Sequence, residues 1–416
     1  MNMKQIPKLA VIGGGASGLA AAITAARRFG GKNVIILEKQ SRVGRKLLAT
    51  GNGRCNLGNR NISSDHYFGD NALIESVLSD FGLKQHKRFF ASLGLLLKED
   101  SEGRLYPNSN QASTVLDCMR NELQRIGVEE KCDFTIDNIT KKKNCFEIHS
   151  GETSINAENI IFACGSKASP SLGSDDSGNR ILKSFGITPS PLFPSLSPVG
   201  TKEKYKILKG VRSSGSVRII ADGDEIRSKR GEIQFSDTGI SGICVFECSR
   251  VVNEYLYLRT VKSKKVNNLI IQLDLMPDYN EIELIKYLRS CKSTFSGLPC
   301  EMILSGALNK KLSEAILTST GIRHKLCSEL DEDDLSTVAD HTKNFTFTPE
   351  KTDSFKTAQV CAGGIGSDEV YPDTLMSRKT NGLYICGEML NVDGDCGGYN
   401  LHFSFGSGIM AAKNIK

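Results

Sequence analysis

The chain has 416 residues, enough for about two or three domains with full hydrophobic cores. Hydrophobic residues make up 39% of it and charged residues 24%, which excludes a disordered chain and a collagen-like chain. Lys and Arg number 53 against 47 Asp and Glu, so the net charge is +6. An excess this small over this length does not indicate a nucleic-acid partner.

The 13 cysteines are scattered, their number is odd, and no CxxC pair occurs. This use of cysteine is typical of buried thiols in a reducing compartment. No apolar run approaches the roughly 18 residues of a membrane span, and no hydrophobic signal segment precedes the first strand. We therefore expect a cytoplasmic protein without a membrane span.

The first forty residues contain the strongest pattern. The apolar run 8–12 predicts a buried parallel strand, and residues 13–18 match GxGxxG. An Ala-rich helix is expected over 19–28, followed by a second apolar strand over 33–37 that ends in Glu38. Strand, glycine motif, helix, strand and acid in this order predict a Rossmann-type dinucleotide site.

Each glycine has its own physical task in such a site. Gly13 allows the tight turn, Gly15 lets the backbone approach a pyrophosphate, and Gly18 lets the helix pack close to the strand. Free N–H groups at the start of the helix attract the phosphates, while Glu38 accepts hydrogen bonds from ribose hydroxyls. This unit alone does not separate FAD from NAD.

Later segments favour FAD. Residues 44–56 offer amides, small residues and cations that can lie flat against a ring system. Apolar strands over 159–165 and 381–387 both end in glycine, and residues 397–400 form a Gly-Gly-Tyr-Asn turn before a final helix. Ligands bind at the carboxyl ends of the strands in a doubly wound sheet. A site assembled from both ends of the chain suits a long two-part cofactor such as FAD.

These segments resemble the BaiN/RdsA-type family of NAD(P)/FAD-dependent oxidoreductases, also called YhiN-like or aminoacetone-oxidase-like flavoproteins. The motifs run in family order over essentially the whole chain. The most specific are Thr-Gly-Asn-Gly-Arg-Cys-Asn at 50–56 and Gly-Gly-Tyr-Asn at 397–400. The other matching segments are 12–19, 44–49, 103–113, 194–198, 231–242, 362–364 and 387–388.

The resemblance implies a set of cofactor-binding residues. The glycine motif and the end of the second strand would hold the ADP half, two cations would lie near the phosphates, and the two specific loops would approach the flavin ring. Strand-ending glycines and a backbone position near the adenine complete the set. Its members are Gly13, Gly15, Ala16, Ser17, Gly18, Glu38, Lys39, Arg45, Lys46, Thr50, Gly51, Asn52, Gly53, Cys55, Asn56, Ile136, Gly165, Gly387, Glu388, Gly398, Tyr399 and Asn400.

The chain departs from the family pattern at several positions. Asp237 replaces the His and Ile243 the Pro of Phe-Thr-His-x-Gly-Ile-Ser-Gly-Pro. Asn391 replaces the Asp that usually follows Gly-Glu, and His402-Phe403 replace Gln-Trp. Cofactor binding survives these changes, but they bear on substrate identity and on any acid–base role of residue 237.

The middle of the chain has a different pattern. Strand-like segments at 215–220, 256–258 and 269–275 predict a small antiparallel sheet or barrel. Helical segments are expected at 280–290, 301–308, 311–317 and 331–339.

With the resemblance, the fold expected is α/β: a Rossmann-like FAD-binding domain of the glutathione-reductase-like two-piece type, with an inserted β-barrel and a small helical domain. The expected boundaries are 1–192 and 352–416 for the FAD-binding domain, 193–272 for the inserted sheet and 273–351 for the helices.

Several kinds of site are absent from the sequence. No P-loop, GxSxG or HExxH motif occurs, and the six histidines show no metal-ligand spacing. No second GxGxxG follows a strand, so a nicotinamide donor would share one cleft with the substrate. No catalytic residue is assigned; the candidates are Cys55, Asp237 and Tyr399, and packing is the competing interpretation for Cys55 and Tyr399.

Taken with the resemblance, we expect an FAD-dependent oxidoreductase that takes a hydride from NAD(P)H. Its acceptor would be an apolar conjugated small molecule such as a 3-oxo bile-acid intermediate. Two alternatives stay open: an amine or aminoketone oxidase that uses oxygen, and a non-catalytic flavoprotein serving as a redox sensor or in RNA modification. We expect a small-molecule substrate, no nucleic acid and no metal; the oligomeric state is left open.

Overall fold

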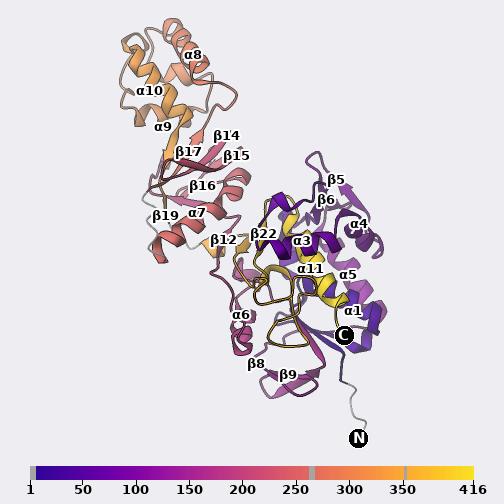
Figure 1. Cartoon of the computed structure of the whole chain (residues 1–416). Coiled ribbons are helices and arrows are strands. Elements are labelled where there is room, and N and C mark those ends of the chain that lie inside the picture. Colours follow the sequence, from indigo (N-terminus) through magenta and orange to yellow (C-terminus); the bar gives the residue numbers. More distant parts are fainter. Residues whose placement is uncertain (1–5, 262–267, 351–353) are drawn as a thin grey trace. The chain divides into compact units, whose positions relative to one another are not determined.

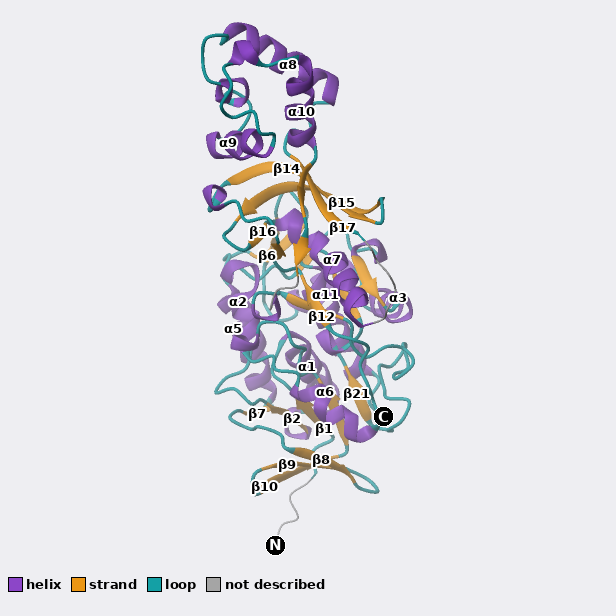
Figure 2. Cartoon of the chain, turned by 90° about the vertical axis from the view of Figure 1, so that its left-hand side faces the viewer, coloured by secondary structure: helices purple, strands orange, loops and turns teal. Residues whose placement is uncertain are grey.

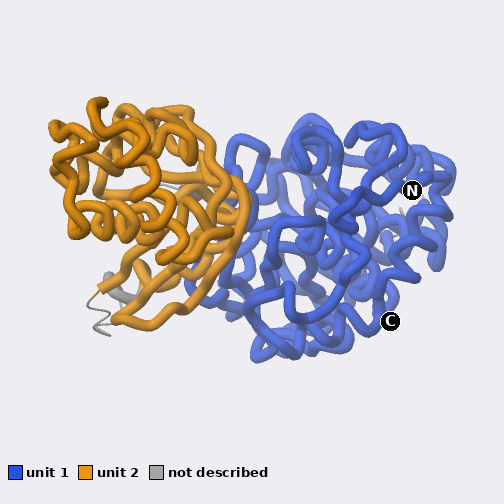
Figure 3. The backbone as a smooth tube through the Cα atoms, turned by 90° about the horizontal axis from the view of Figure 1, so that it is seen from above, with its two compact units in different colours: residues 1–192, 359–416 blue, residues 193–358 orange. Residues whose placement is uncertain are grey.

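The computed structural model describes residues 6–261, 268–350 and 354–416. They form two compact units, Met1–Leu192 with Gln359–Lys416 (unit 1) and Phe193–Ala358 (unit 2) (Figure 3). The second stretch of unit 1 thus begins at Gln359, whereas we expected it from residue 352. The chain stays in unit 2 for longer because the 3-10 helix η9 (Ser354–Lys356) still contacts β12 (Phe193–Ser195) of that unit.

A five-stranded parallel sheet forms the centre of unit 1, and β1 lies in its middle (Figure 2). In spatial order the strands are β21 (Leu383–Ile385), β11 (Asn159–Phe162), β1 (Leu9–Ile12), β2 (Val34–Leu37) and β7 (Glu129–Lys131). All residues of β1, β2 and β11 are buried, as in parallel sheets covered on both faces. Ile161 pairs with Val11 on one side and Tyr384 on the other, so the three strands that precede glycines lie side by side, as predicted.

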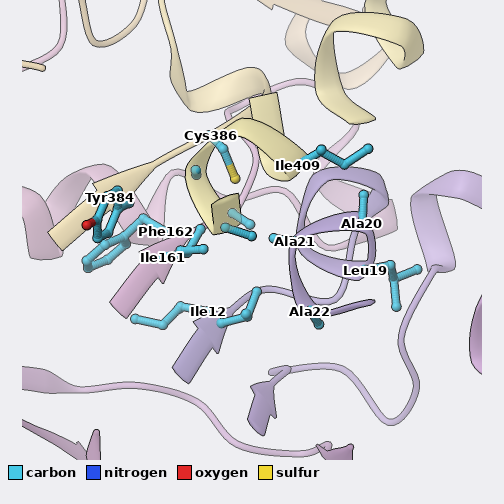
Figure 4. Close-up of a cluster of buried hydrophobic side chains, with 14 of the residues drawn as sticks. Ile12, Leu19, Ala20, Ala21, Ala22, Ile161, Phe162, Tyr384, Cys386 and Ile409 are labelled. Atoms are coloured by element: carbon cyan, nitrogen blue, oxygen red, sulfur yellow. The ribbon is translucent and has the colours of Figure 1, made fainter. Parts of the chain in front are cut away.

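Two long helices from opposite ends of the chain pack on each other in unit 1. They are α1 (Ala16–Phe29) and α11 (Tyr399–Lys413), and α5 (Ala112–Ile126) also contacts α1. A Cβ added to Gly408 would lie 2.2 Å from the carbonyl oxygen of Ser17, so the two helix backbones touch there. Figure 4 shows Ile12, Phe162 and Ile409 within the cluster that this packing buries.

Shorter elements complete unit 1 (Figure 1). The helices are α2 (Arg45–Ala49), α3 (Asn71–Asp80), α4 (Leu83–Ala91) and α6 (Ser177–Leu182). β8 (Asn138–Lys141), β9 (Phe146–Ser150) and β10 (Thr153–Ala157) form one antiparallel sheet, and β3 (Gly58–Asn59), β6 (Arg104–Pro107) and β5 (Leu97–Glu99) form another. The pair of β4 (Tyr67–Gly69) with β22 (Val392–Gly394) joins segments from the two ends of the chain.

Unit 2 contains the predicted antiparallel sheet, with seven strands. In spatial order they are β18 (Phe345–Phe347), β17 (Leu269–Asp274), β14 (Arg212–Ala221), β15 (Asp224–Phe235), β16 (Gly239–Ser241), β13 (Val199–Thr201) and β19 (Pro349–Glu350). The outermost strands, β18 and β19, are separated in sequence by Thr348 alone. The sheet therefore curves until its two edges meet, in the manner of a small barrel.

Two predicted elements of unit 2 are wrong. Residues 256–258 were expected to be a strand, but they belong to helix α7 (Ile243–Val261). Its aromatic and β-branched residues favour strands, but Cys244, Cys248 and Val252 recur every four residues and are buried against the sheet. Residues 301–308 form only the 3-10 helix η7 (Cys300–Leu304), since Gly306 disfavours a longer helix.

The other three predicted helices of unit 2 are present. They are α8 (Glu281–Thr294), α9 (Lys310–Ser319) and α10 (Glu332–Lys343). Each begins at a side chain that accepts a hydrogen bond from the first turn, namely Asn280, Asn309 and Asp331, so local capping determines where they start. Within the described part of the chain, no helix combines the length and apolar character needed to cross a membrane.

Candidate functional site

The turn between β1 and α1 is crowded on one side and open on the other. A Cβ added to Gly13 would lie 2.5 Å from the carbonyl oxygen of Ala163, and a Cβ added to Gly18 would lie 1.9 Å from that of Gly13. A Cβ added to Gly15 would meet no atom of the described residues within 4 Å. Gly15 is the N-cap of α1 and supplies no side chain to the free N–H groups of the first turn. This geometry fits a pyrophosphate over Gly15.

Glu38 is held at the edge of this turn. One carboxylate oxygen accepts the N–H of Gly14 at 2.7 Å, and the other accepts the N–H of Gln40 at 2.8 Å. A carboxylate has about four acceptor sites, so both oxygens can also bind ribose hydroxyls. The backbone N–H of Phe134 donates to the Glu38 carbonyl, and half-buried Ile136 follows two residues later along the same edge.

Two of the cations expected near the cofactor are bound by neighbouring side chains. Lys39 forms an ion pair with Asp175 at 2.6 Å. Burial alone would raise the pKa of Asp175, but hydrogen bonds from Lys39 and Ser177 lower it to about 2. Arg45 donates to the side chain of Gln40 at 2.7 Å and keeps further N–H donors that could reach a phosphate.

Lys46 is paired with Glu388, the acid that follows β21. The two charged groups are 2.7 Å apart, and Lys46 also donates to the carbonyl oxygen of Ala168. The other oxygen of Glu388 accepts the N–H of Cys361. Because its charge is matched by Glu388, Lys46 adds little net positive charge, and the N–H groups at the start of α1 fit a phosphate better than Lys46 does.

A glycine follows β11 and β21 within three residues, and the second of them, Gly387, lies beside the start of α1. Gly165 and Gly387 both have positive φ, 72° and 71°. A Cβ added to Gly387 would lie 2.4 Å from the hydroxyl of Ser17. The backbone N–H of Gly387 donates to the hydroxyl of Ser407 on α11. Ser17 is buried and Ala16 half-buried, so the first turn of α1 is packed against the C-terminal strand.

The two most specific loops meet. The side-chain amide of Asn56 donates to the carbonyl oxygen of Gly58 at 2.9 Å and accepts the N–H of Gly398 at 3.2 Å. Asn59 donates to the carbonyl oxygen of Gly397 at 3.2 Å. Segments more than 330 residues apart in the sequence therefore form one wall of the site. The side-chain amide of Asn400 accepts the N–H of Gly394 and donates to the carbonyl oxygen of Gly394, so it fixes the backbone of this wall.

The tip of the first loop presents backbone donors. Gly51, Asn52 and Gly53 have φ values of 57°, 53° and 80° and are exposed, and Thr50 before them is half-buried. Successive residues in this left-handed region leave N–H groups free to face a ligand. Such donors fit the polar edge of a flavin ring. We call the α1 turn, Glu38, this loop and the 397–400 turn the cofactor cradle.

A family model described as "HI0933-like protein Rossmann domain" matches residues 7–414. The chain belongs to the HI0933-like family. The family resemblance predicted from the motifs is therefore confirmed.

Curated relatives match along almost the whole chain. The 3-dehydro-bile acid delta(4,6)-reductase of Clostridium scindens is 38% identical over 98% of each protein. The ribosomal RNA dihydrouridine synthase of Haemophilus influenzae is 26% identical over 99% of each protein, and that of Escherichia coli is 24% identical over 97% of each. The fold is shared with E. coli quinol fumarate reductase at a TM-score of 0.50 and 13% identity, over 98% of this chain and 69% of that one. The family match and the reductase relative identify the chain as an FAD-binding oxidoreductase.

The three catalytic candidates of this HI0933-like chain are differently placed. Cys55 is buried. Burial raises the pKa of its thiol, a hydrogen bond with Thr50 offsets part of that rise, and the resulting pKa is about 12. The nucleophilic thiolate is therefore scarce at neutral pH. Asp237 is an exposed residue of unit 2 and pairs with Lys209 at 2.5 Å. Tyr399 is 4% exposed and packs within the wall of the cradle. No group of three or more metal-ligating side chains occurs among the described residues.

Sequence reasoning missed two residues beside the cradle, His66 and Asp395. His66 Nδ1 lies 3.4 Å from an oxygen of Asp395. The Gly-Gly-Tyr-Asn motif placed residues near Asp395 at the site, but nothing in the sequence placed His66 there. A lone histidine before a three-residue strand has no local pattern that a motif search could use.

A stacked pair of buried histidines lies behind the cradle wall. The rings of His86 and His402 are 4.8 Å apart and nearly parallel, and a Cβ on Gly58 would lie 3.2 Å from His86. Burial lowers the pKa of His402 to about 4 and that of His86 well below its usual value. Both rings are therefore neutral at pH 7.

This pair predicts a loss of stability in mild acid. Between about pH 6.5 and pH 4 the unfolded chain binds a proton at His402 that the folded chain does not, so stability falls as pH falls through this range. From pH 7 to pH 5, wild type should lose roughly 2 kcal/mol more unfolding free energy than His402→Gln. Denaturant unfolding at both pH values measures this, with half-exposed His149→Gln as control. An equal loss in wild type and His402→Gln would contradict the assignment.

Proposed function

We propose that this chain uses NAD(P)H to reduce a carbon–carbon double bond conjugated to a ketone in a small apolar molecule. A 3-oxo steroid of the bile-acid type is the first candidate. The observation that supports this most is the 38% identity over 98% of each chain to an enzyme named for reducing such double bonds. The residues proposed for the cradle suit a flavin dinucleotide, because they combine a phosphate turn, a ribose acceptor and backbone donors for a ring.

When bound, FAD supplies the capacity to accept a hydride from one molecule and pass it to another. The chain's own residues would hold and orient it. The first-turn N–H groups of α1 over Gly15 would bind the pyrophosphate, and Glu38 would bind the ribose. Residues 50–53 and the 397–400 turn would border the ring. Nicotinamide and substrate would use one entrance in turn, because no second dinucleotide motif occurs in the sequence.

Anaerobic half-reactions test the proposal. Mixing the yellow holoprotein with NADH or NADPH should bleach the flavin, and adding a Δ4- or Δ4,6-3-oxo steroid should restore the colour with formation of the saturated ketone. Absence of bleaching with both nucleotides would overturn it. Peroxide formation from an amine or aminoketone without NAD(P)H would favour the oxidase alternative.

A second candidate substrate is uracil in RNA, favoured by the two relatives named ribosomal RNA dihydrouridine synthase. Dihydrouridine is uridine with its ring double bond saturated next to a carbonyl, so the reaction class is the same. Our expectation of no nucleic-acid partner stays a prediction. Ribosomal RNA offered to the reduced holoprotein tests it, since a gain of two hydrogens in a uridine would contradict that expectation.

A further inference from the structure

We propose that His66, oriented by Asp395, donates the proton that completes double-bond reduction. The inference rests on the proposed function. Reduction of an enone needs two groups delivered to two carbons: a hydride at the β carbon and a proton at the α carbon. The cofactor accounts for the hydride, and the proton must come from a positioned acid or from water.

Sheet register brings these residues together across 329 positions of sequence. β4 and β22 are antiparallel, and Tyr67 lies opposite Gly394. The next pair outward is His66 and Asp395, where the Asp395 N–H donates to the His66 carbonyl oxygen at 2.9 Å. Two backbone strands therefore set the side chains opposite each other, which makes their separation a property of the fold.

The two side chains of the pair differ in exposure, as expected for a histidine that is oriented by a buried carboxylate. The Asp395 side chain is 5% exposed, whereas that of His66 is 34% exposed. A buried carboxylate beside Nδ1 favours the tautomer with a proton on Nδ1. Among the described residues, no hydrogen bond to Nε2 is formed, so this nitrogen can exchange its proton with a ligand or with solvent.

Neighbouring residues fix the His66 ring. Its ring stacks on that of Tyr399, with centroids 4.2 Å apart and planes 18° from parallel. Tyr399 is fixed in turn, because its backbone carbonyl accepts the hydroxyl of Tyr67 at 3.0 Å. The side-chain amide of Asn400 donates to the backbone carbonyl oxygen of Asp395 and so holds that backbone in place. The pair is therefore attached directly to the 397–400 wall of the cradle.

The step balances in atoms and electrons. A hydride brings two electrons to the β carbon, the double-bond pair moves onto the α carbon and ketone oxygen, and Nε2 of protonated His66 transfers its proton to the α carbon. The products are the saturated ketone and neutral His66, which regains a proton from water. Neither Cys55 nor Tyr399 matches this role as well, because both are buried.

His66→Asn is the central test, since its amide nitrogen can keep the bond to Asp395. His149→Asn is a matched control: His149 is 35% exposed and lies 3.4 Å from the carboxylate of Glu147, on hairpin strand β9. We expect both variants to keep the wild-type FAD content and the wild-type rate of bleaching by NAD(P)H. Reoxidation by the enone should fall about 10²-fold or more in His66→Asn alone. Asp395→Asn, which alters a positioning residue, should give a smaller fall.

Two further measurements separate proton donation from a structural role. In D₂O, wild type should place deuterium on one face of the α carbon, and His66→Asn should place it on both faces. In the oxidised protein without NAD(P)H, adding the enone should shift the imidazole proton resonance of His66 in NMR spectra and leave that of His149 unchanged.

The outcomes distinguish the two proposals. If the enone reoxidises the flavin at the same rate in wild type and in His66→Asn, the role of His66 is overturned and the proposed function stands. Wild type that is bleached but not reoxidised by any enone would overturn the proposed function, and the inference with it.

Discussion

Gly15→Val is expected to yield a folded, colourless protein. A side chain at this position meets no atom of the described residues within 4 Å, and its φ of −81° suits any residue. The methyl groups would instead occupy the space that we assign to the pyrophosphate. We expect FAD affinity to fall at least about 10²-fold, which is roughly 3 kcal/mol. Flavin absorbance per mole of protein and titration of the apoprotein with FAD measure this.

Gly18→Ala is the matched comparison on the same turn. Its methyl group would lie 1.9 Å from the carbonyl oxygen of Gly13, so the strand and helix could not keep their approach. We expect this variant to be unfolded or insoluble, whereas Gly15→Val costs only the ~1 kcal/mol of a poorer helix cap. Wild-type FAD content in Gly15→Val would contradict the placement of the pyrophosphate.

Gly398→Ala is expected to separate the two halves of the cradle wall. Gly398 has a φ of 99°, and an added Cβ would lie 2.4 Å from the carbonyl oxygen of Gly58 and 2.6 Å from Asn56. The positive φ alone costs about 1–2 kcal/mol, and the backbone clash adds to it. We expect a loss of unfolding free energy of about 3 kcal/mol or more, together with loss of flavin. Denaturant unfolding and flavin absorbance test both.

Gly223→Ala isolates the contribution of the clash. Gly223 has a φ of 100°, almost the same as Gly398, but no atom of the described residues lies within 4 Å of an added Cβ. This variant should lose only the cost of the backbone conformation and should keep its flavin. Equal destabilisation in the two variants would contradict a tight joint at Gly398.

Much of unit 1 could be predicted from sequence because its signals are local. The apolar runs of β1 and β2, the glycine turn and Glu38 lie within about thirty consecutive residues. Strand propensity, helix propensity and glycine spacing act over such distances. The same reasoning failed for α7, because its residue types favour strands and only burial against the sheet of unit 2 selects the helix.

Motifs along the whole chain predicted the family, and neighbouring residues predicted the Rossmann turn and the strands that end in glycine. The contacts between distant side chains, in contrast, become apparent only in the folded chain. Lys46 pairs with Glu388 across 342 positions, and His66 meets Asp395 across 329. Such pairs depend on strand register and helix packing between the two ends of the chain, and no local pattern encodes that distance in space.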